Sequence, residues 1–349
     1  MGIGLAKAPG ARHAPPPRSR RWWSPARIAM LTAGGAILMT LTILPLLRPT
    51  GWPFTPPFHP YFAPGTRLYV DPHNAAAQWV RRNPDDRRAA VIDRRIAARP
   101  QALWFTDPDP VSIRAQVTAA VADAARRRAI PVLVAYAIPH RDCGRDSAGG
   151  SGAIADYRRW IDGFAAGMGR AETMVILEPD ALANVSCLSA RQQADRYAAL
   201  SYAARTLHGS DPRARVYYDA GNSNWQPART MAKRLRAAGI EHYGNGIALN
   251  VSNFNRTHDE VRYGLSVLDR LDDGRLAMVV DTSRNGNGPA RGRRAACDPS
   301  GRRIGAPPTT APGADRVDAY LWIKNPGQAD GCAAAAGVFV PGNAYRLAR

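Results

Sequence analysis

The sequence predicts an α/β fold: a distorted parallel (β/α) barrel of about seven strands that makes up one large domain. Three observations lead to this prediction. Seven short apolar runs recur along the chain, helical patterns lie between several of them, and no GxGxxG motif is present. Strands that alternate with helices indicate a parallel sheet. Seven strands without a dinucleotide-binding motif favour a barrel over a dinucleotide-binding fold, and the P-loop, HExxH and GxSxG motifs are also absent.

The apolar runs that we expect to form strands are rich in residues with high β propensity. In chain order they are Leu103–Phe105, Val132–Tyr136, Met174–Leu177, Val216–Tyr218, Ile247–Leu249, Met278–Val280 and Tyr320–Ile323. Two helices between them can be placed from the pattern. Ile113 to Arg128 has apolar residues at the spacing of one helix face. Thr257 and Glu260 predict a capping box that opens a helix ending at Leu271.

The amino terminus predicts a membrane-spanning segment. Residues 1–27 form a basic tail, and Ile28–Leu47 is a run of twenty residues without a charge, long enough to span a bilayer. The arginines before it predict that the tail stays in the cytoplasm. The run ends without the small-x-small site of a cleaved signal peptide, so we interpret it as an uncleaved signal-anchor. A cleaved signal for secretion remains the alternative, and a buried soluble helix fits less well.

Residues 48–66 are rich in proline and aromatic residues and predict a stiff, extended linker. The folded domain is then expected to comprise residues 67–349 and to lie outside the membrane. In that oxidising compartment the four cysteines favour two disulfides over free thiols. None of them forms a CxxC pair, so we expect no zinc site.

The formal net charge of +19 raises the question of nucleic-acid binding. The first 50 residues hold +7 of it without an acid, and the remainder is spread along the chain with one local cluster around Arg291, Arg293 and Arg294. Zinc-finger spacing and RNA-binding aromatic motifs are absent from the sequence. We therefore expect no nucleic-acid partner.

Polar or aromatic residues stand at or just beyond the end of every predicted strand. In order they are Trp104, Tyr136, Asp180, Asp219, Asn250, Asp281 and Lys324. In parallel α/β barrels the carboxyl ends of the strands meet at the face that holds the active site. Asp180, in the sequence Glu178-Pro179-Asp180, could also be a turn residue or a helix cap. Because a cap does not explain all seven positions, we expect Asp180 to point into a shared site.

Four stretches, in order, resemble the motifs of glycoside hydrolase family 6, the cellulases that cut β-1,4-glucan with inversion. They are VAYAIPHRDCG (Val134–Gly144), VILEPDAL (Val175–Leu182), DTSRNGNGP (Asp281–Pro289) and YLWIKNPGQADGC (Tyr320–Cys332). The resemblance is to the actinobacterial endoglucanase type and covers roughly residues 67–347. It implies a monomeric hydrolase of cellulose-like β-glucan, secreted or held at the cell membrane. It implies no metal or organic cofactor, because two carboxylates and water suffice for the reaction.

The same resemblance implies catalytic roles. Asp180 would be the general acid, and Asp142 would be its partner, whose charge raises the pKa of the acid. Tyr136 would lie beneath the sugar at the point of cleavage, and Asp330 is the candidate general base. Inversion requires the acid and base carboxyl groups to lie ~6.5–9.5 Å apart. The implied disulfides are Cys143–Cys187 and Cys297–Cys332, each fastening a loop that carries a catalytic carboxylate.

A glucan cleft should also present aromatic platforms and hydrogen-bonding groups. Trp104 and Trp225 match the tryptophans of family subsites, although Trp104 could belong to the core. Lys324 could instead be a surface charge, and Asp219 a turn residue. The residues that we expect to bind substrate or to orient the carboxylates are Trp104, Trp225, Asp219, Asn222, Asn253, Lys324, Gln328, Arg284 and Asn285.

The sequence departs from the family pattern at three places. Asn222 stands where the family usually has His, Gln328 stands where Glu is expected, and Ala295-Ala296 replaces a frequent tryptophan platform. These departures leave open a second hypothesis, a relative that binds envelope glucan without cutting it. The loop after Arg-Asp-Cys is short, which favours an open cleft and cleavage within the glucan chain.

Overall fold

The computed structural model of the protein describes residues 61–63, 65–144, 149–292 and 297–349. This part of the chain forms a parallel sheet of seven strands, in which each strand pairs with the next one along the sequence. The strands are β1 (Leu103–Phe105), β2 (Val132–Ala135), β3 (Thr173–Leu177), β4 (Ala214–Asp219), β5 (Gly246–Leu249), β6 (Ala277–Asp281) and β7 (Val317–Leu321). The predicted fold class is confirmed.

Strands β1 and β7 do not pair with each other in the sheet, yet contacts join them. Ala102 N–H donates to the carbonyl of Trp322 at 3.0 Å. The indole N–H of Trp104 donates to the carbonyl of Ile323 at 2.8 Å. These bonds bring the first and last strands together, so the sheet curls into a barrel with one irregular seam.

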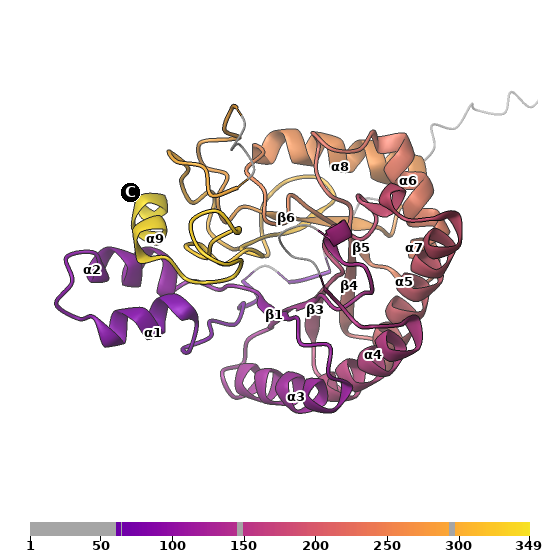
Figure 1. Cartoon of the computed structure of the whole chain (residues 1–349), viewed down its shortest axis with the longest axis horizontal. Coiled ribbons are helices and arrows are strands. Elements are labelled where there is room, and N and C mark those ends of the chain that lie inside the picture. Colours follow the sequence, from indigo (N-terminus) through magenta and orange to yellow (C-terminus); the bar gives the residue numbers. More distant parts are fainter. Residues whose placement is uncertain (1–60, 64, 145–148, 293–296) are drawn as a thin grey trace, which may run out of the picture. The chain divides into compact units, whose positions relative to one another are not determined.

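Helices run along the outside of the strands (Figure 1). They are α3 (Pro110–Arg126), α4 (Ile154–Met168), α5 (Ala190–Ser210), α6 (Ala228–Ala237), α7 (Ile240–Tyr243) and α8 (Thr257–Leu271). A second group of helical segments shares one small apolar cluster and lies together in Figure 1. It consists of α1 (Ala75–Arg82), α2 (Ala89–Ile92), the π-helix η1 (Asp93–Ala97) and α9 (Pro341–Ala348). Two short 3₁₀ turns, η2 (Asp142–Gly144) and η3 (Val185–Cys187), follow β2 and β3.

The two faces of the sheet belong to two apolar clusters. Successive side chains of a strand point to opposite faces. Leu133 and Val175 therefore pack with the helices, while Val134, Met174 and Ile176 pack with the barrel interior. This double burial explains why the predicted strands are continuous apolar runs rather than alternating ones.

The last predicted strand is displaced. We expected Tyr320–Ile323, whereas β7 is Val317–Leu321. Its start was hidden by Asp318, a fully buried carboxylate within the strand that lies at a register shift between β6 and β7. Asp318 accepts hydrogen bonds from Tyr61 N–H and the Tyr217 hydroxyl, and these bonds compensate for a charge that interrupts the apolar pattern.

The helix to Leu271 is confirmed, but the predicted capping box is wrong. Arg256 is the N-cap of α8 and makes no side-chain cap bond. The Thr257 hydroxyl accepts from the side chain of Asn285, and Glu260 accepts from Ser223 instead of reaching back to the N-cap. The capping box that the structure does contain opens α5, where Ser189 and Gln192 cap each other.

The chain already packs against the barrel at Tyr61 and Phe62, before the expected domain boundary at residue 67. Phe62 is 2% exposed and belongs to the interior cluster. Tyr61 bonds to Asp318 and to the carbonyl of Arg275, which stand at the amino-terminal ends of β7 and β6. The expected basic tail, signal-anchor and most of the linker lie outside the described residues. Among the helices that the structure does describe, none is long and apolar enough to cross a bilayer.

Candidate active site

A cleft with a volume of about 840 Å³ lies at the carboxyl-terminal ends of the strands. All four residues predicted to take part in catalysis line it: Tyr136, Asp142, Asp180 and Asp330. Of the residues predicted to bind substrate or to orient the carboxylates, six also line it, namely Trp104, Asn222, Trp225, Asn253, Lys324 and Gln328. Residues that are up to 226 positions apart in the sequence thus share one cavity, since Trp104 and Asp330 both face it.

Asp180 reaches the cleft through a sharp turn after β3. Glu178 and Asp180, on either side of Pro179, both have positive φ angles of 50° and 69°, a region that residues other than glycine rarely occupy. The N–H of Asp180 donates to Asp219 Oδ2 at 2.9 Å. The strained turn is therefore held by the neighbouring strand, as expected for backbone strain at a functional site.

Asp219 lies beneath Asp180 and does not line the cleft, which differs from the expectation that it contacts substrate. It is 2% exposed, and its carboxylate also accepts the N–H of Gly221. Burial, followed by the nearby charge of Asp180, raises the pKa of Asp219 well above its ordinary value. Its geometry is that of a support for the Asp180 turn.

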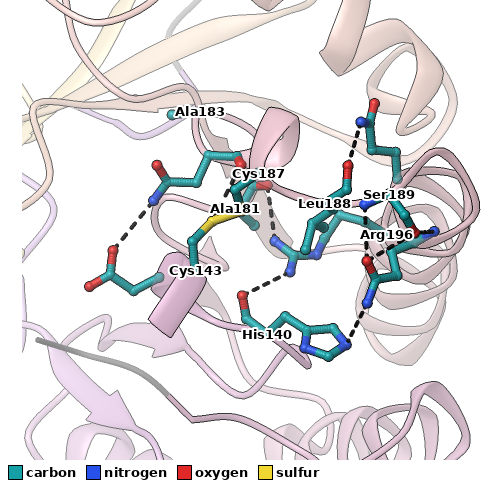
Figure 2. The surroundings of a disulfide bond; sticks show 12 residues. His140, Cys143, Ala181, Ala183, Cys187, Leu188, Ser189 and Arg196 are labelled. Atoms are coloured by element: carbon teal, nitrogen blue, oxygen red, sulfur yellow. Dashed lines mark hydrogen bonds between the residues drawn. A yellow bond between two sulfur atoms is a disulfide. The ribbon is translucent and has the colours of Figure 1, made fainter. Parts of the chain in front are cut away.

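Asn184 connects the loops of Asp142 and Asp180. Its side-chain amide donates to Asp142 Oδ1 at 3.4 Å, and its main-chain N–H donates to the carbonyl of Asp180 at 2.9 Å. The disulfide Cys143–Cys187 joins the same two loops, as Figure 2 shows. The predicted pairing is present, and the second predicted disulfide, Cys297–Cys332, is present as well.

Tyr136 is fixed by an aromatic neighbour and by a cation. The ring of Trp104 meets it edge-on at 5.3 Å between centroids. The guanidinium of Arg141 lies 4.3 Å from its ring centroid and donates to its carbonyl. Trp104 therefore both lines the cleft and packs against the core. The prediction of a cleft residue and the alternative of a core residue are each partly right. Arg141 was not predicted, although it stands in the Arg-Asp-Cys motif.

Asp330 is paired with two cations. Arg284 Nη1 lies 2.8 Å from its Oδ2, and Lys324 Nζ lies 3.2 Å from its Oδ1. Burial alone would raise the pKa of Asp330, but the charges of Arg284 and Lys324 outweigh it and lower the pKa. Burial lowers the pKa of Lys324, and Asp330 opposes that shift. Asp330 is thus an ionised carboxylate, and Lys324 is not a surface charge.

The loop of Asp330 is organised by Asp298, which sequence reasoning missed. The Asp298 carboxylate accepts the N–H groups of Asp330, Cys332 and Ala333. In return Asp298 N–H donates to Asp330 Oδ2 at 3.2 Å. The only signal in the sequence is that Asp298 follows Cys297.

Arg284 and Asn285 do not line the cleft, but Arg284 binds the carboxylate of Asp330, which is the second of the two roles predicted for these residues. Arg284 is 3% exposed and lies over the Phe254 ring while it binds Asp330. The Asn285 amide donates to the carbonyl of Asn255 and to the Thr257 hydroxyl. Both residues support the site from below.

Two of the polar strand ends, Asn250 and Asp281, are also buried away from the cleft. The Asp281 carboxylate accepts the main-chain N–H groups of Ser252, Ser283, Ile323 and Lys324. Burial raises the pKa of Asp281, and these N–H groups oppose the shift. Such residues tie loops together at the end of the barrel and do not face substrate.

The family model described as "Glycosyl hydrolases family 6" matches residues 63–340. The chain belongs to this family. Among family 6 relatives, Endoglucanase A of Thermobispora bispora is 47% identical over 293 residues, which are 84% of this chain and 63% of that protein. Endoglucanase 1 of Streptomyces sp. (strain KSM-9) is 46% identical over 271 residues, which are 77% of this chain and 75% of that protein.

A solved family 6 structure has the same fold. The endoglucanase Cel6 of Mycobacterium tuberculosis, in complex with methyl-cellobiosyl-4-deoxy-4-thio-β-D-cellobioside, is 42% identical to this chain. Its TM-score is 0.76, and the match covers 81% of this chain and 96% of that one. The family predicted from the four motifs is confirmed.

Proposed function

We propose that the protein is an inverting endo-β-1,4-glucanase that hydrolyses cellulose-like β-glucan. The observation that carries the proposal is that Asp142, Asp180 and Asp330 line one cleft at the carboxyl-terminal end of the barrel. The proposal is supported by relatives named endoglucanases at 46–47% identity. It is also supported by the thio-linked cello-oligosaccharide that the Mycobacterium tuberculosis enzyme holds in its complex.

In the proposed reaction Asp180 donates a proton to the leaving glycosidic oxygen. Asp142, whose loop is joined to that of Asp180 by Asn184 and the disulfide, would keep that proton in place, because two close carboxylates resist joint ionisation. A water attacks the opposite face of the sugar with Asp330 as the base, which inverts the anomeric centre. The low pKa of Asp330 keeps it ionised, and its two cations also restrain its basicity.

The proposed substrate contacts are side chains that line the cleft. Trp104 and Trp225 would stack on the apolar faces of glucose rings, while Tyr136 would lie beneath the ring that is cut. Asn222, Asn253 and Gln328 would bind hydroxyl groups. The oxygen of Asn222 already accepts from Asn224 N–H and the Asn255 amide, so its own amide group is the part that we assign to the sugar.

We assign the protein to the space outside the cytoplasm, secreted or held in the membrane by Ile28–Leu47, and acting as a monomer. The two disulfides support an oxidising compartment. The membrane segment rests on the sequence pattern alone.

The test is release of reducing sugar from a soluble β-glucan by the full-length protein. We expect turnover, and we expect Asp180→Asn to lower kcat by about 10²–10⁴ while binding persists, because general acid catalysis typically contributes that much. Asp195→Asn, at an exposed position of α5, is the control and should leave kcat unchanged. NMR of fresh products from cello-oligosaccharides should show the inverted anomer. Binding without turnover in the unmutated protein would instead support the glucan-binding hypothesis that Asn222 and Gln328 keep open.

A further inference from the structure

A buried carboxyl group, Glu178, connects the two loops that carry Asp142 and Asp180. Glu178 directly follows β3, and it is 1% exposed. Both of its oxygens accept the N–H of Ala137, at 3.0 and 3.1 Å, and Oε2 also accepts the N–H of Ile138 at 3.1 Å. Ala137 and Ile138 lie at the start of the loop after β2. A side chain this deeply buried cannot contact a polysaccharide.

Arg196, from α5, connects the same two loops through their carbonyl groups. It is 3% exposed, and its guanidinium donates to Ala181 at 3.0 Å, to Pro139 at 2.6 Å and to His140 at 3.3 Å. Figure 2 shows Arg196 reaching between Ala181 and His140, next to the disulfide. Glu178 thus binds the N–H groups of the β2 loop, and Arg196 binds carbonyl groups of both loops.

We propose that Glu178 and Arg196 are positioning residues, a clamp that sets the separation of Asp142 and Asp180. The proposal rests on the proposed function of those two aspartates. Burying two ionisable groups is a poor way to stabilise a fold, but charged groups form stronger and more directional hydrogen bonds than neutral ones. The disulfide joins the loops farther out, at Cys143 and Cys187, while the clamp fixes them where they leave the strands.

The pKa of Glu178 is set by its burial and by the groups that surround its carboxyl group. Burial raises the pKa of Glu178 to about 7, while the N–H groups of Ala137 and Ile138, the Tyr157 hydroxyl on α4 and the charge of Arg196 oppose the shift. Because the folded pKa exceeds the ordinary value, the unfolded chain loses this proton first. The free energy of unfolding therefore falls through this group as pH rises from about 4.5 towards 7. A glutamine at this position removes that dependence.

Two variants of the full-length protein test the clamp. At a pH above about 7, where Glu178 is ionised, Glu178→Gln keeps the shape but turns one acceptor into a donor that faces an N–H group. Arg196→Lys keeps the charge, but its single nitrogen cannot take the places of both Nη1, which binds Ala181, and Nη2, which binds Pro139 and His140. We expect each to lower kcat at least tenfold with KM changed less than twofold. We expect the double variant to lose no more than twofold beyond the worse single one, because the two residues act on the same loops. Hydrogen exchange should quicken in residues 137–143 and 178–187.

Asp318→Asn is the matched control. Asp318 is as buried as Glu178 and also accepts a main-chain N–H, but it lies at the opposite end of the barrel. This variant should lower the melting temperature and leave kcat unchanged. The clamp is overturned if Glu178→Gln and Arg196→Lys behave like Asp318→Asn, with wild-type kcat and wild-type hydrogen exchange in the two loops. If the wild type shows no turnover while exchange in the two loops quickens in the variants, the proposed function fails and the loop clamp remains.

Discussion

Arg284 and Asp330 form an ion pair of 2.8 Å in which the guanidinium is 3% and the carboxylate 12% exposed. Each of these buried charges compensates the cost of burying the other. Removing one partner of such a pair typically costs about 3–5 kcal/mol, since the other charge stays buried without compensation. The pair therefore links the stability of the domain to the charge state of the proposed base.

Arg284→Gln should shift the acidic limb of the kcat/KM profile to higher pH. Burial raises the pKa of Asp330, and in the variant only Lys324 and the N–H of Asp298 would oppose it. The carboxylate then protonates at a higher pH, so activity that needs its ionised form is lost earlier on acidification. The measurement is a pH–rate profile on cello-oligosaccharides. Arg303→Gln, on an exposed side chain of a neighbouring loop, serves as control, and an unmoved limb in Arg284→Gln would contradict the assignment of Asp330 as base.

The two cleft tryptophans should respond differently to substitution. Trp225→Ala should raise KM by about tenfold, because a lost aromatic stacking contact costs on the order of 1 kcal/mol or more, and Trp225→Phe should restore most of the affinity. Trp104→Phe should keep the stacking surface yet lower the free energy of unfolding by about 1 kcal/mol. The reason is that it removes the hydrogen bond to Ile323 that crosses the barrel seam. Steady-state kinetics and urea unfolding of the same samples separate the effects on KM and on the free energy of unfolding. The prediction fails if Trp225→Phe and Trp104→Phe lower the free energy of unfolding equally.

Loss of either disulfide should destabilise the domain by a similar amount. The cysteines are 44 and 35 positions apart, and chain-entropy arguments give roughly 4 kcal/mol for closed loops of this size. In Cys297→Ser/Cys332→Ser the carboxylate of Asp298 still holds Asp330 N–H, so we expect measurable kcat despite the lower stability. Urea unfolding and turnover of this variant and of Cys143→Ser/Cys187→Ser check this prediction. Complete inactivity of a folded Cys297→Ser/Cys332→Ser protein would show that Asp298 does not suffice.

Phe62→Ala should lower stability without affecting turnover. The ring is buried inside the barrel, and removing a buried Phe side chain typically costs about 3–5 kcal/mol. Since Phe62 packs at the amino-terminal ends of the strands, kcat should stay at the wild-type value. Val111→Ala, at a position that is 82% exposed, should be neutral. A fall in kcat at temperatures well below unfolding would show that the two ends of the barrel are coupled.

The sequence predicted the seven strands well because burial on both faces leaves continuous apolar runs. It placed β7 wrongly where Asp318 interrupts the run. A hydrogen bond to Tyr61, 257 positions away, makes that buried charge tolerable, and no local pattern reveals such a partner. The capping box at Thr257 failed for a related reason, since Glu260 and Thr257 bind residues of other loops.

For the site, the rule that polar residues at strand ends converge was right for Tyr136, Asp180 and Lys324, which line the cleft. It was too broad for Asp219 and Asp281, whose buried carboxylates accept main-chain N–H groups instead of lining the cleft. Asp180 has the same residue type as Asp219 and Asp281, but it lies three positions beyond the end of β3, whereas the other two are the last residues of β4 and β6. Glu178 was noted only as a neighbour of Asp180, and Asp298 was not noted, because both carboxylates bind main-chain groups, which leave no trace in the sequence.

Tyr61 enters the domain at the amino-terminal ends of β6 and β7, while the cleft opens at the other end of the barrel. The described part of the chain therefore enters the barrel at the end opposite the groove. A resin or a fused protein joined directly before Tyr61 would therefore lie at the end of the barrel away from the polysaccharide. Immobilisation at Tyr61 would leave the groove unobstructed, whereas coupling at Cys297, which lines the cleft, would obstruct it.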